Sequence, residues 1–460
     1  MYIEQLYTSC LAEAAYYIES NGEAAIIDPL RETNTYVELA EKRNAKIKYI
    51  FETHFHADFV SGHIDLANKT GAKIVYGPTA QAEYNIYEAE DDEIFPLGKI
   101  NLKLLHTPGH TLESSCILLY NEEGLPHSIF TGDTVFVGDV GRPDLAVKSD
   151  LSKEDLAALL YDSIHNKIMP LPDDLIIYPG HGAGSACGKN IGKETQTTLG
   201  IQKKNNYALC CATKKEFVDS VTAGLEEPPK YFFIDAAINK KGYQNIDEVM
   251  AKNAIPLTIA QFEEEINKGV VVLDARNADT FESGFIPGSI NIGLNGQYAV
   301  WVGSLIDHGK PIIIVADSGK EEEAVLRLAR VGYEHVFGYL DGGFDAWVKA
   351  GKTIDIIDSI EPESMADLLK NEMHLIVDVR NPSEWGNGVL EGAELIPLSK
   401  LETQLKHLDK NQKYLVHCAG GYRSMMAASI LKKNGFNHIK NVHGGINKIR
   451  ESGFLLIVPN

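Results

Sequence analysis

The sequence has few cysteines and no long hydrophobic run, and each absence excludes a class of protein. Six cysteines in 460 residues are too few for a disulfide-stapled domain, so in a reducing compartment we expect the thiols to be free, metal-bound or catalytic. No apolar run reaches the roughly 18 residues that a membrane-spanning helix needs. The first residues, MYIEQLYTSCLAEAAYYIES, lack the basic start and apolar core of a signal peptide. We therefore expect a cytoplasmic protein.

Positive charge is also in short supply. The chain has 43 Lys and Arg against 64 Asp and Glu, a formal net charge of −21. Such an excess disfavours a nucleic acid or an anionic membrane as partner. The hydrophobic content of 44% is ordinary for a globular protein. The length predicts two to four domains, at about 100–200 residues each.

The C-terminal half contains an internal repeat. Residues 271–292 resemble 375–398, and residues 311–347 resemble 413–449. The nearly constant offset of about 100 residues indicates two domain copies and not a solenoid. In each copy a short β-branched strand is followed by a second strand, a loop and a helix, which predicts an α/β domain.

The N-terminal region has a different pattern, in which short apolar segments alternate with turns. The strands expected there are 24–28, 46–54, 73–77, 101–107, 114–120, 127–135 and 175–181. We therefore predict three domains, with a linker near residues 240–258. They are residues 1–252, 253–354 and 355–460.

Histidine and aspartate follow the N-terminal strands in four segments, ETHFHADF, HTPGHT, TGDTVF and YPGHG. A metal site needs imidazoles and carboxylates that converge from several strand ends, and this pattern supplies them. One HxH alone would be a weak signal, but four segments in this order predict a metal centre. The candidate residues are His54, His56, Asp58, His110, Asp133 and His181.

These four segments resemble the metallo-β-lactamase superfamily, and the resemblance covers the whole N-terminal region. It implies an αββα sandwich. In the two-metal pattern HxHxDH the last His belongs to the second site, but here Phe59 follows Asp58, and a phenyl ring cannot ligate a metal. We therefore predict one metal, which disfavours two-zinc hydrolysis of the glyoxalase II type.

Within that superfamily the one-metal pattern resembles the persulfide dioxygenases. The resemblance implies one Fe(II) per chain, held by His54, His110 and Asp133, a two-His, one-carboxylate set that leaves positions open for O₂ and substrate. The other three residues of the four segments then become hydrogen-bond partners around the metal. Zinc stays open as the alternative metal, because imidazole ligands do not choose cleanly between the two. The structural alternative is that these residues only hydrogen-bond turns.

Three more residues belong to the predicted site. Arg142 in GDVGRPD and Tyr178 before PGH match substrate contacts of the dioxygenases; alternatively Arg142 stabilises its own loop and Tyr178 packs. Cys187 in GSACG, six positions after His181, is a candidate thiolate that holds or relays sulfane sulfur, or else a small buried hydrophobe. GHGAGSACGK and Phe59 together resemble bacterial proteins in which a dioxygenase is fused to rhodanese domains.

Cys418 ends the apolar segment KYLVHC and opens the loop CAGGYRS before a helix. Backbone N–H groups of a tight Gly-rich loop and a helix N-terminus stabilise a thiolate, and Arg423 adds positive charge. The other loop residues expected to hold a persulfide are Ala419, Gly420, Gly421, Tyr422 and Ser424.

The motif CxxGxR, with VDVR upstream and HGGI downstream, resembles the rhodanese sulfurtransferases, which implies sulfur transfer through Cys418. The alternatives are a structural cysteine and a Cys-dependent phosphatase, although phosphatase loops normally have one more residue between Cys and Arg. In the first copy Asp317 and Glu322 stand near the positions of Cys418 and Arg423. That copy is therefore predicted to be inactive, as a spacer or docking surface.

Together these resemblances imply a persulfide dioxygenase joined to a sulfurtransferase, in sulfide detoxification. A low-molecular-weight thiol persulfide would be oxidised by O₂ to sulfite and free thiol, and Cys418 would pass sulfane sulfur to sulfite, giving thiosulfate. The expected partners are these small molecules and further copies of the chain in a homo-oligomer, with no nucleic acid and no membrane. The alternatives are a zinc thioester hydrolase of the glyoxalase II kind with a rhodanese attachment, and a sulfur-sensing or carrier scaffold.

Overall fold

The computed structural model describes residues 1–145 and 151–459. The chain divides into two compact units, Met1–Val249 with Ala329–Gly332, and Met250–Leu328 with Tyr333–Asn460. The division falls inside α7 (Ile246–Asn253), within the segment where a linker was expected, so part of that segment is helical. The three domain boundaries remain predictions. In the part of the chain that is described, no helix is both long and apolar enough to cross a membrane.

The first unit is built on two six-stranded sheets, with the orders β1-β2-β3-β4-β5-β6 and β12-β11-β10-β9-β8-β7. The strands of the first sheet are β1 (Tyr2–Thr8), β2 (Glu13–Ser20), β3 (Glu23–Ile27), β4 (Lys46–Phe51), β5 (Lys73–Tyr76) and β6 (Tyr87–Glu88). Those of the second are β7 (Ile94–Leu97), β8 (Ile100–His106), β9 (Ser115–Tyr120), β10 (Pro126–Gly132), β11 (Ile176–Pro179) and β12 (Thr197–Thr198).

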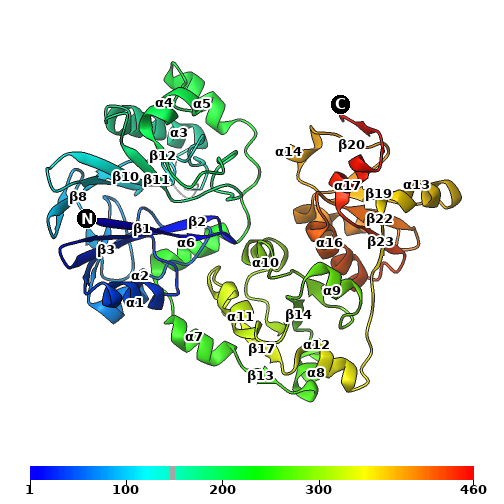
Figure 1. Ribbon diagram of the computed structural model, residues 1–460. Helices are drawn as coiled ribbons and strands as arrows, with labels where there is room; N and C mark the ends of the chain where they lie inside the picture. The colour runs from blue at the N-terminus through cyan, green and yellow to red at the C-terminus, as the bar shows by residue number, and fades with distance from the viewer. Residues whose placement is uncertain (146–150, 460) are drawn as a thin grey trace. The chain divides into compact units, whose positions relative to one another are not determined.

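Helices cover the outer face of each sheet, so the unit has four layers (Figure 1). Apolar side chains such as Tyr16, Phe51, Leu102 and Phe130 fill the space between the sheets. Two further clusters lie between a sheet and its helices. The helices on the first sheet are α1 (Asn34–Lys42) and α2 (His63–Thr70); those on the second are α3 (Lys153–Ser163), α4 (Leu199–Asn205) and α5 (Lys214–Thr222). A π-helical turn (Ile164–Ile168) extends α3, and α6 (Phe232–Lys241) follows α5.

The seven expected strands are present as β3, β4, β5, β8, β9, β10 and β11. The hairpin of β1 and β2 was not expected, although β2 is among the most buried strands of the unit. Tyr16 packs into the core between the sheets and Tyr17 into the core under α1 and α2. A strand buried on both faces shows no alternation of polar and apolar residues, which is why the pattern missed it.

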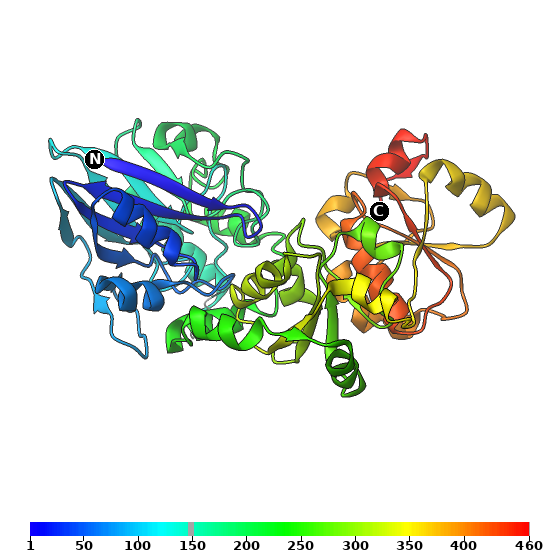
Figure 2. The same cartoon turned by 60° about the horizontal axis from the view of Figure 1, so that its bottom comes forward.

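The second unit contains two copies of one α/β fold. In Figure 2 the first copy is coloured from green to yellow and the second from yellow to red. Their parallel sheets have the orders β13-β17-β16-β14-β15 and β18-β23-β22-β19-β21. The first copy has β13 (Pro256–Leu257), β14 (Val271–Asp274), β15 (Ile290–Asn291), β16 (Ile312–Val315), β17 (Val336–Leu340), α8 (Ile259–Asn267), α9 (Ala278–Glu282), α10 (Tyr298–Leu305), α11 (Glu321–Ala329) and α12 (Gly343–Lys349).

The second copy repeats this order of elements with a small addition. It has β18 (Asp358–Ile360), β19 (Leu375–Asp378), β21 (Glu394–Leu395), β22 (Tyr414–His417), β23 (Ile439–Val442), α13 (Pro362–Asn371), α14 (Pro382–Trp385), α15 (Leu401–Gln404), α16 (Tyr422–Lys433) and α17 (Gly445–Glu451). Two 3₁₀ turns (Leu398–Lys400, Leu405–His407) flank α15, and β20 (Val389–Leu390) pairs with β24 (Leu456–Ile457). Because β16 and β22 occupy equivalent places, Asp317 and Cys418 begin equivalent loops at the carboxyl ends of their sheets.

Candidate functional site

Three of the predicted metal residues meet beyond the carboxyl ends of β4, β8 and β10. The Nε2 atoms of His54 and His110 lie 3.9 and 3.4 Å from Asp133 Oδ2. One ligand atom from each of the three residues lies within 4.8 Å of the others. All three side chains are buried, so their polar atoms have no access to bulk water.

Hydrogen bonds leave the Nε2 atom of each histidine free. His110 Nδ1 lies 2.9 Å from the carbonyl oxygen of Arg142; a carbonyl only accepts, so Nδ1 carries the proton. Thr53 Oγ1 donates its hydrogen to Asp28 Oδ2 and therefore accepts from His54 Nδ1, at 3.0 Å. Burial lowers the pKa of both imidazoles, which keeps them neutral. Among the described residues these two neutral nitrogens and the Asp133 carboxylate are buried without hydrogen-bond partners, a combination that fits a metal ion.

A second group of three lies beside the first. His56, Asp58 and His181 each offer a ligand atom within 4.8 Å of the others, and His181 Nε2 lies 3.4 Å from Asp58 Oδ2 and 3.5 Å from Asp133 Oδ1. Phe59 is fully buried and packs on the His56 ring, with ring centroids 4.3 Å apart. Phe59 removes one ligand of the two-metal pattern, yet His56 still gives this group a nitrogen beside Asp58 and His181. The expectation of a single metal therefore stays a prediction.

Two buried carboxylates behind His56 were missed by the sequence reasoning. Asp28 Oδ1 and Glu52 Oε2 lie 3.1 and 3.6 Å from His56 Nε2. Burial raises the pKa of Glu52 well above its usual value, and the Asp28 carboxylate raises it further. The available signals were that Asp28 ends an expected strand and that Glu52 precedes His54 by two residues. Nε2 of His56 therefore faces these two carboxyl groups.

Cys187 lies at the same centre. Its sulfur is within 4.8 Å of ligand atoms of Asp133 and His181, and its side chain is buried. Burial raises the pKa of the Cys187 thiol well above its usual value, and the carboxylates of Asp58 and Asp133 raise it further. These surroundings favour the thiol over the expected thiolate, an effect that a bound cation would oppose. The relay role of Cys187 remains a prediction.

Each nitrogen of the Arg142 guanidinium donates to a protein group. Its Nε and Nη2 donate to the two carboxylate oxygens of Asp144, at 2.7 and 2.9 Å. Its Nη1 and Nη2 donate to the carbonyls of Ala186 and Glu226. Only 6% of the residue is exposed. This geometry matches the alternative in which Arg142 stabilises its own loop, so its substrate contact remains a prediction.

Tyr178 is likewise held by packing. Its ring stacks on Phe130, with centroids 5.2 Å apart and planes at 16°, and tilts against Tyr16 at 5.4 Å. Burial raises the pKa of the Tyr178 hydroxyl, which keeps it neutral. The ring thus belongs to the core between the sheets, and a substrate contact would have to come from the hydroxyl alone.

Cys418 sits in a closed loop between β22 and α16. Gly421 N–H donates to Cys418 Sγ at 3.1 Å, and Ser424 Oγ lies 3.6 Å from the sulfur. Gly421 has a φ of 106°, a conformation that costs glycine little and that turns its N–H toward the sulfur. The Tyr422 hydroxyl points elsewhere and donates to the carbonyl of Gly293. The loop therefore offers the Gly421 N–H to the sulfur, while the Tyr422 side chain is held outside.

Arg423 does not act on the loop as a free charge. Its Nη1 and Nη2 donate to Oε2 and Oε1 of Glu384, at 2.5 and 2.8 Å. Although burial alone would raise it, the pKa of Glu384 is lowered by the Arg423 guanidinium. Glu384 was missed by the sequence reasoning; its signal was the Asn381–Glu384 capping box that starts α14. The charge expected to favour the thiolate is thus balanced by a carboxylate.

The equivalent loop of the first copy lacks each of these features. Asp317 is exposed, and Lys320 stands where Gly421 supplies its N–H. Glu322 and Thr280 replace Arg423 and Glu384, so both halves of the ion pair are gone. These replacements agree with the prediction that this copy forms no persulfide.

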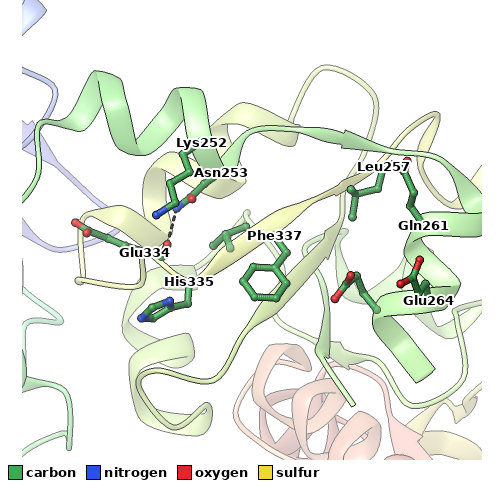
Figure 3. A pocket seen from close by; sticks show the side chains of 10 residues that line it. Lys252, Asn253, Leu257, Gln261, Glu264, Glu334, His335 and Phe337 are labelled. Carbon is green, nitrogen blue, oxygen red and sulfur yellow. Dashed lines mark hydrogen bonds between the residues drawn. The ribbon is translucent and has the colours of Figure 1, made fainter. Parts of the chain in front are cut away.

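A pocket of about 440 Å³ lies elsewhere in the first copy (Figure 3). Its lining includes Lys252, Gln261, Glu264, Glu334 and Phe337, and the Phe337 ring is half exposed. These residues come from α7, α8 and the start of β17, at the opposite ends of the strands from the Asp317 loop. The pocket is therefore no remnant of a cysteine site.

Family models match most of both units. The model described as the metallo-beta-lactamase superfamily matches residues 9–181, and the rhodanese-like domain model matches residues 258–350 and 361–452. A solved structure described as a metallo-beta-lactamase from Staphylococcus aureus is 32% identical, with a TM-score of 0.66, and the match covers 74% of this chain and 98% of that one. The chain belongs to the metallo-β-lactamase superfamily. The predicted fold, a metallo-β-lactamase fold followed by two rhodanese-like domains, is confirmed.

Curated relatives of this metallo-β-lactamase-fold chain have two different activities. A hydroxyacylglutathione hydrolase of Pelagibacter ubique is 32% identical over 177 residues, 37% of this chain and 68% of the relative. The mitochondrial persulfide dioxygenase ETHE1 of Homo sapiens is 32% identical over 162 residues, 35% of this chain and 59% of the relative. The identities are equal, but the hydroxyacylglutathione hydrolases are the stronger matches and are covered over more of their length. Overall similarity therefore does not favour the dioxygenase.

Proposed function

We propose that this protein is a persulfide dioxygenase joined to a sulfurtransferase, acting in sulfide detoxification. The observation that carries the proposal is the group of His54, His110 and Asp133, with two free Nε2 atoms facing one carboxylate. A two-His, one-carboxylate group leaves coordination positions open and suits Fe(II). The persulfide dioxygenase relative and the Cys418 loop support the same assignment.

The substrate of the first site is a low-molecular-weight thiol persulfide. Fe(II), when bound, supplies the redox chemistry with O₂ that the side chains lack. The carbonyl of Arg142 and the hydroxyl of Thr53 orient His110 and His54, so the ligands are held in place before substrate arrives. Overall, R–S–SH, O₂ and water become R–SH, sulfite and two protons.

Cys418 performs the second reaction. Its thiolate attacks the outer sulfur of R–S–SH, forming Cys418–S–SH and releasing R–S⁻. Sulfite then attacks that outer sulfur and leaves as thiosulfate, which frees the Cys418 thiolate and one proton. Gly421 N–H and the N-terminus of α16 stabilise the anionic sulfur at both stages.

Oxygen uptake tests the dioxygenase half. Protein reconstituted anaerobically with Fe(II) should consume O₂ and release sulfite when a thiol persulfide is added. Zinc-loaded protein and an Asp133→Asn variant should do neither, because each lacks the redox metal at the site. Zinc-dependent turnover without O₂ consumption would contradict the proposal.

Separated assays test the transferase half. Cys418→Ser should keep O₂ uptake but form no thiosulfate from persulfide and sulfite, whereas Asp133→Asn should show the reverse. These two variants are matched controls for one another, because each leaves the other site intact. Normal thiosulfate formation by Cys418→Ser would remove the second half of the proposal.

A zinc-dependent thioester hydrolase is the second candidate. It is favoured by the hydroxyacylglutathione hydrolase relative and by the second group of His56, Asp58 and His181, which offers a place for a second metal. Hydrolysis of a glutathione thioester by the zinc form, at equal rates with and without O₂, would favour this reading. Phe59 counts against the hydrolase, because a phenyl ring cannot ligate the second metal.

A further inference from the structure

We propose that the first, inactive copy is a positioning element for the Cys418 loop, and that Tyr422 is the residue through which it acts. The proposal rests on the proposed transferase role of Cys418. It gives the first copy a function that needs no nucleophile of its own. Tyr422 lies between Gly421, which donates to the sulfur, and Arg423.

Tyr422 reaches across to the first copy. Its hydroxyl donates to the carbonyl of Gly293 at 2.7 Å, a contact between residues 129 positions apart in the sequence. A Cβ atom on Gly296 would lie only 2.6 Å from Tyr422 Cζ, so the ring packs directly on the backbone there. Burial raises the pKa of the Tyr422 hydroxyl, which keeps it a proton donor. We call residues 293–296 the seat.

The seat is itself held by a buried arginine of the first copy. Arg327 on α11 donates from Nη1 to the Leu294 carbonyl at 2.6 Å and from Nη2 to the Gly296 carbonyl at 2.9 Å. Leu294 N–H donates to the carbonyl of Ala275 at 3.0 Å. The seat therefore has a fixed backbone before Tyr422 meets it. In the second copy the position of Arg327 is taken by Ala428, so this support is a feature of the inactive copy.

Two further contacts fix the copies against each other around the loop. Ser429 Oγ accepts from Asn291 N–H at 3.0 Å, and His443 Nε2 lies 3.1 Å from the carboxylate of Glu282. Helices α9 and α16 are in contact. With these anchors in place, a shift of the seat moves Tyr422, and through it the Gly421 N–H that faces Cys418.

A double-mutant cycle tests the positioning role. Tyr422→Phe removes only the hydroxyl bond. Arg327→Met releases the seat and also removes the charge that lowers the pKa of the Tyr422 hydroxyl, an effect that Arg327→Lys retains. Each variant should lower kcat for thiosulfate formation about fivefold, which is the effect expected from losing one hydrogen bond. KM for the persulfide should stay unchanged. The double variant should be no slower than either single one, because both changes break the same support. Arg327→Lys can still donate to one of the two carbonyls, so its kcat should lie between that of the wild type and that of Arg327→Met.

Tyr298→Phe is the matched control. Its hydroxyl is buried near the seat and has no hydrogen-bond partner among the described residues, so its removal should leave kcat unchanged. Full activity in Tyr422→Phe, or additive losses in the double variant, would overturn the positioning role.

A second readout separates this proposal from the proposed function. Cys418 is only 1% exposed, so loosening the loop should speed its alkylation by iodoacetamide about fivefold in each single variant and no further in the double. If wild-type protein transfers no sulfur but this alkylation coupling appears, the transferase is wrong and the positioning stands. If sulfur transfer is normal and the coupling is absent, the positioning is wrong and the transferase stands.

Discussion

One side chain at the metal centre controls how many metals we expect the first unit to hold. Phe59 fills the position after Asp58 where the two-metal pattern has a histidine. Phe59→His should therefore raise the bound metal from about one to about two ions per chain, measured by elemental analysis of anaerobically purified protein. Phe59→Leu, which keeps an apolar side chain, should stay at about one. Two ions in the wild-type protein would contradict the single-metal prediction.

A second residue-scale prediction concerns Glu384. Arg423 lowers the pKa of this carboxyl in the folded protein, so the ion pair stabilises the fold above the unfolded-state pKa, and that stability is lost as pH falls through the folded pKa. Glu384→Gln should cost about 1 kcal/mol of unfolding free energy at pH 7, since the pair is partly screened by water. Below about pH 4 the difference from wild type should shrink.

Urea denaturation at pH 7 and below about pH 4 measures this difference. Glu391→Gln, at an exposed position of the same copy, is the control for removing one surface charge and should change little at either pH. A loss for Glu384→Gln that stays the same size in acid would show that the carboxylate does not act through its charge.

At the scale of the element, the loops after β16 and β22 differ in more than their first residue. Asp317→Cys, made in a Cys418→Ser background, restores a thiol but not its surroundings: Lys320 replaces Gly421, and Glu322 removes the ion pair. We expect no thiosulfate formation above that of Cys418→Ser alone. Measurable recovery would mean that a cysteine after the strand suffices and that the loop backbone contributes little.

At the scale of the whole molecule, the metal group and Cys418 belong to different compact units. A ligand stabilises only the folded unit that binds it. Chelating the metal should therefore lower the melting temperature of the first unit by about 5 °C. In calorimetry the transition of the second unit should stay unshifted. Alkylation of Cys418 should leave the metal content unchanged. One transition that shifts as a whole would contradict this independence.

Local patterns predicted much of the fold and part of the site. Strands with polar residues at their ends could be recognised from short segments, and the repeat was visible because both copies keep the same spacing. The hairpin of β1 and β2 was missed because a doubly buried strand has no alternation. Glu52 and Glu384 were missed because a carboxylate is notable only once its partner is known.

The sequence by itself determined the order of domains, the residue types available for a metal, and the presence of a cysteine in only one of the two repeated loops. These features depend on residues close together in the chain. Only the tertiary structure decided that Arg142 is held by Asp144, that Glu384 pairs with Arg423, and that Tyr422 rests on the first copy. Those contacts join side chains and carbonyls brought together by packing, and no local pattern encodes which of many polar groups will meet.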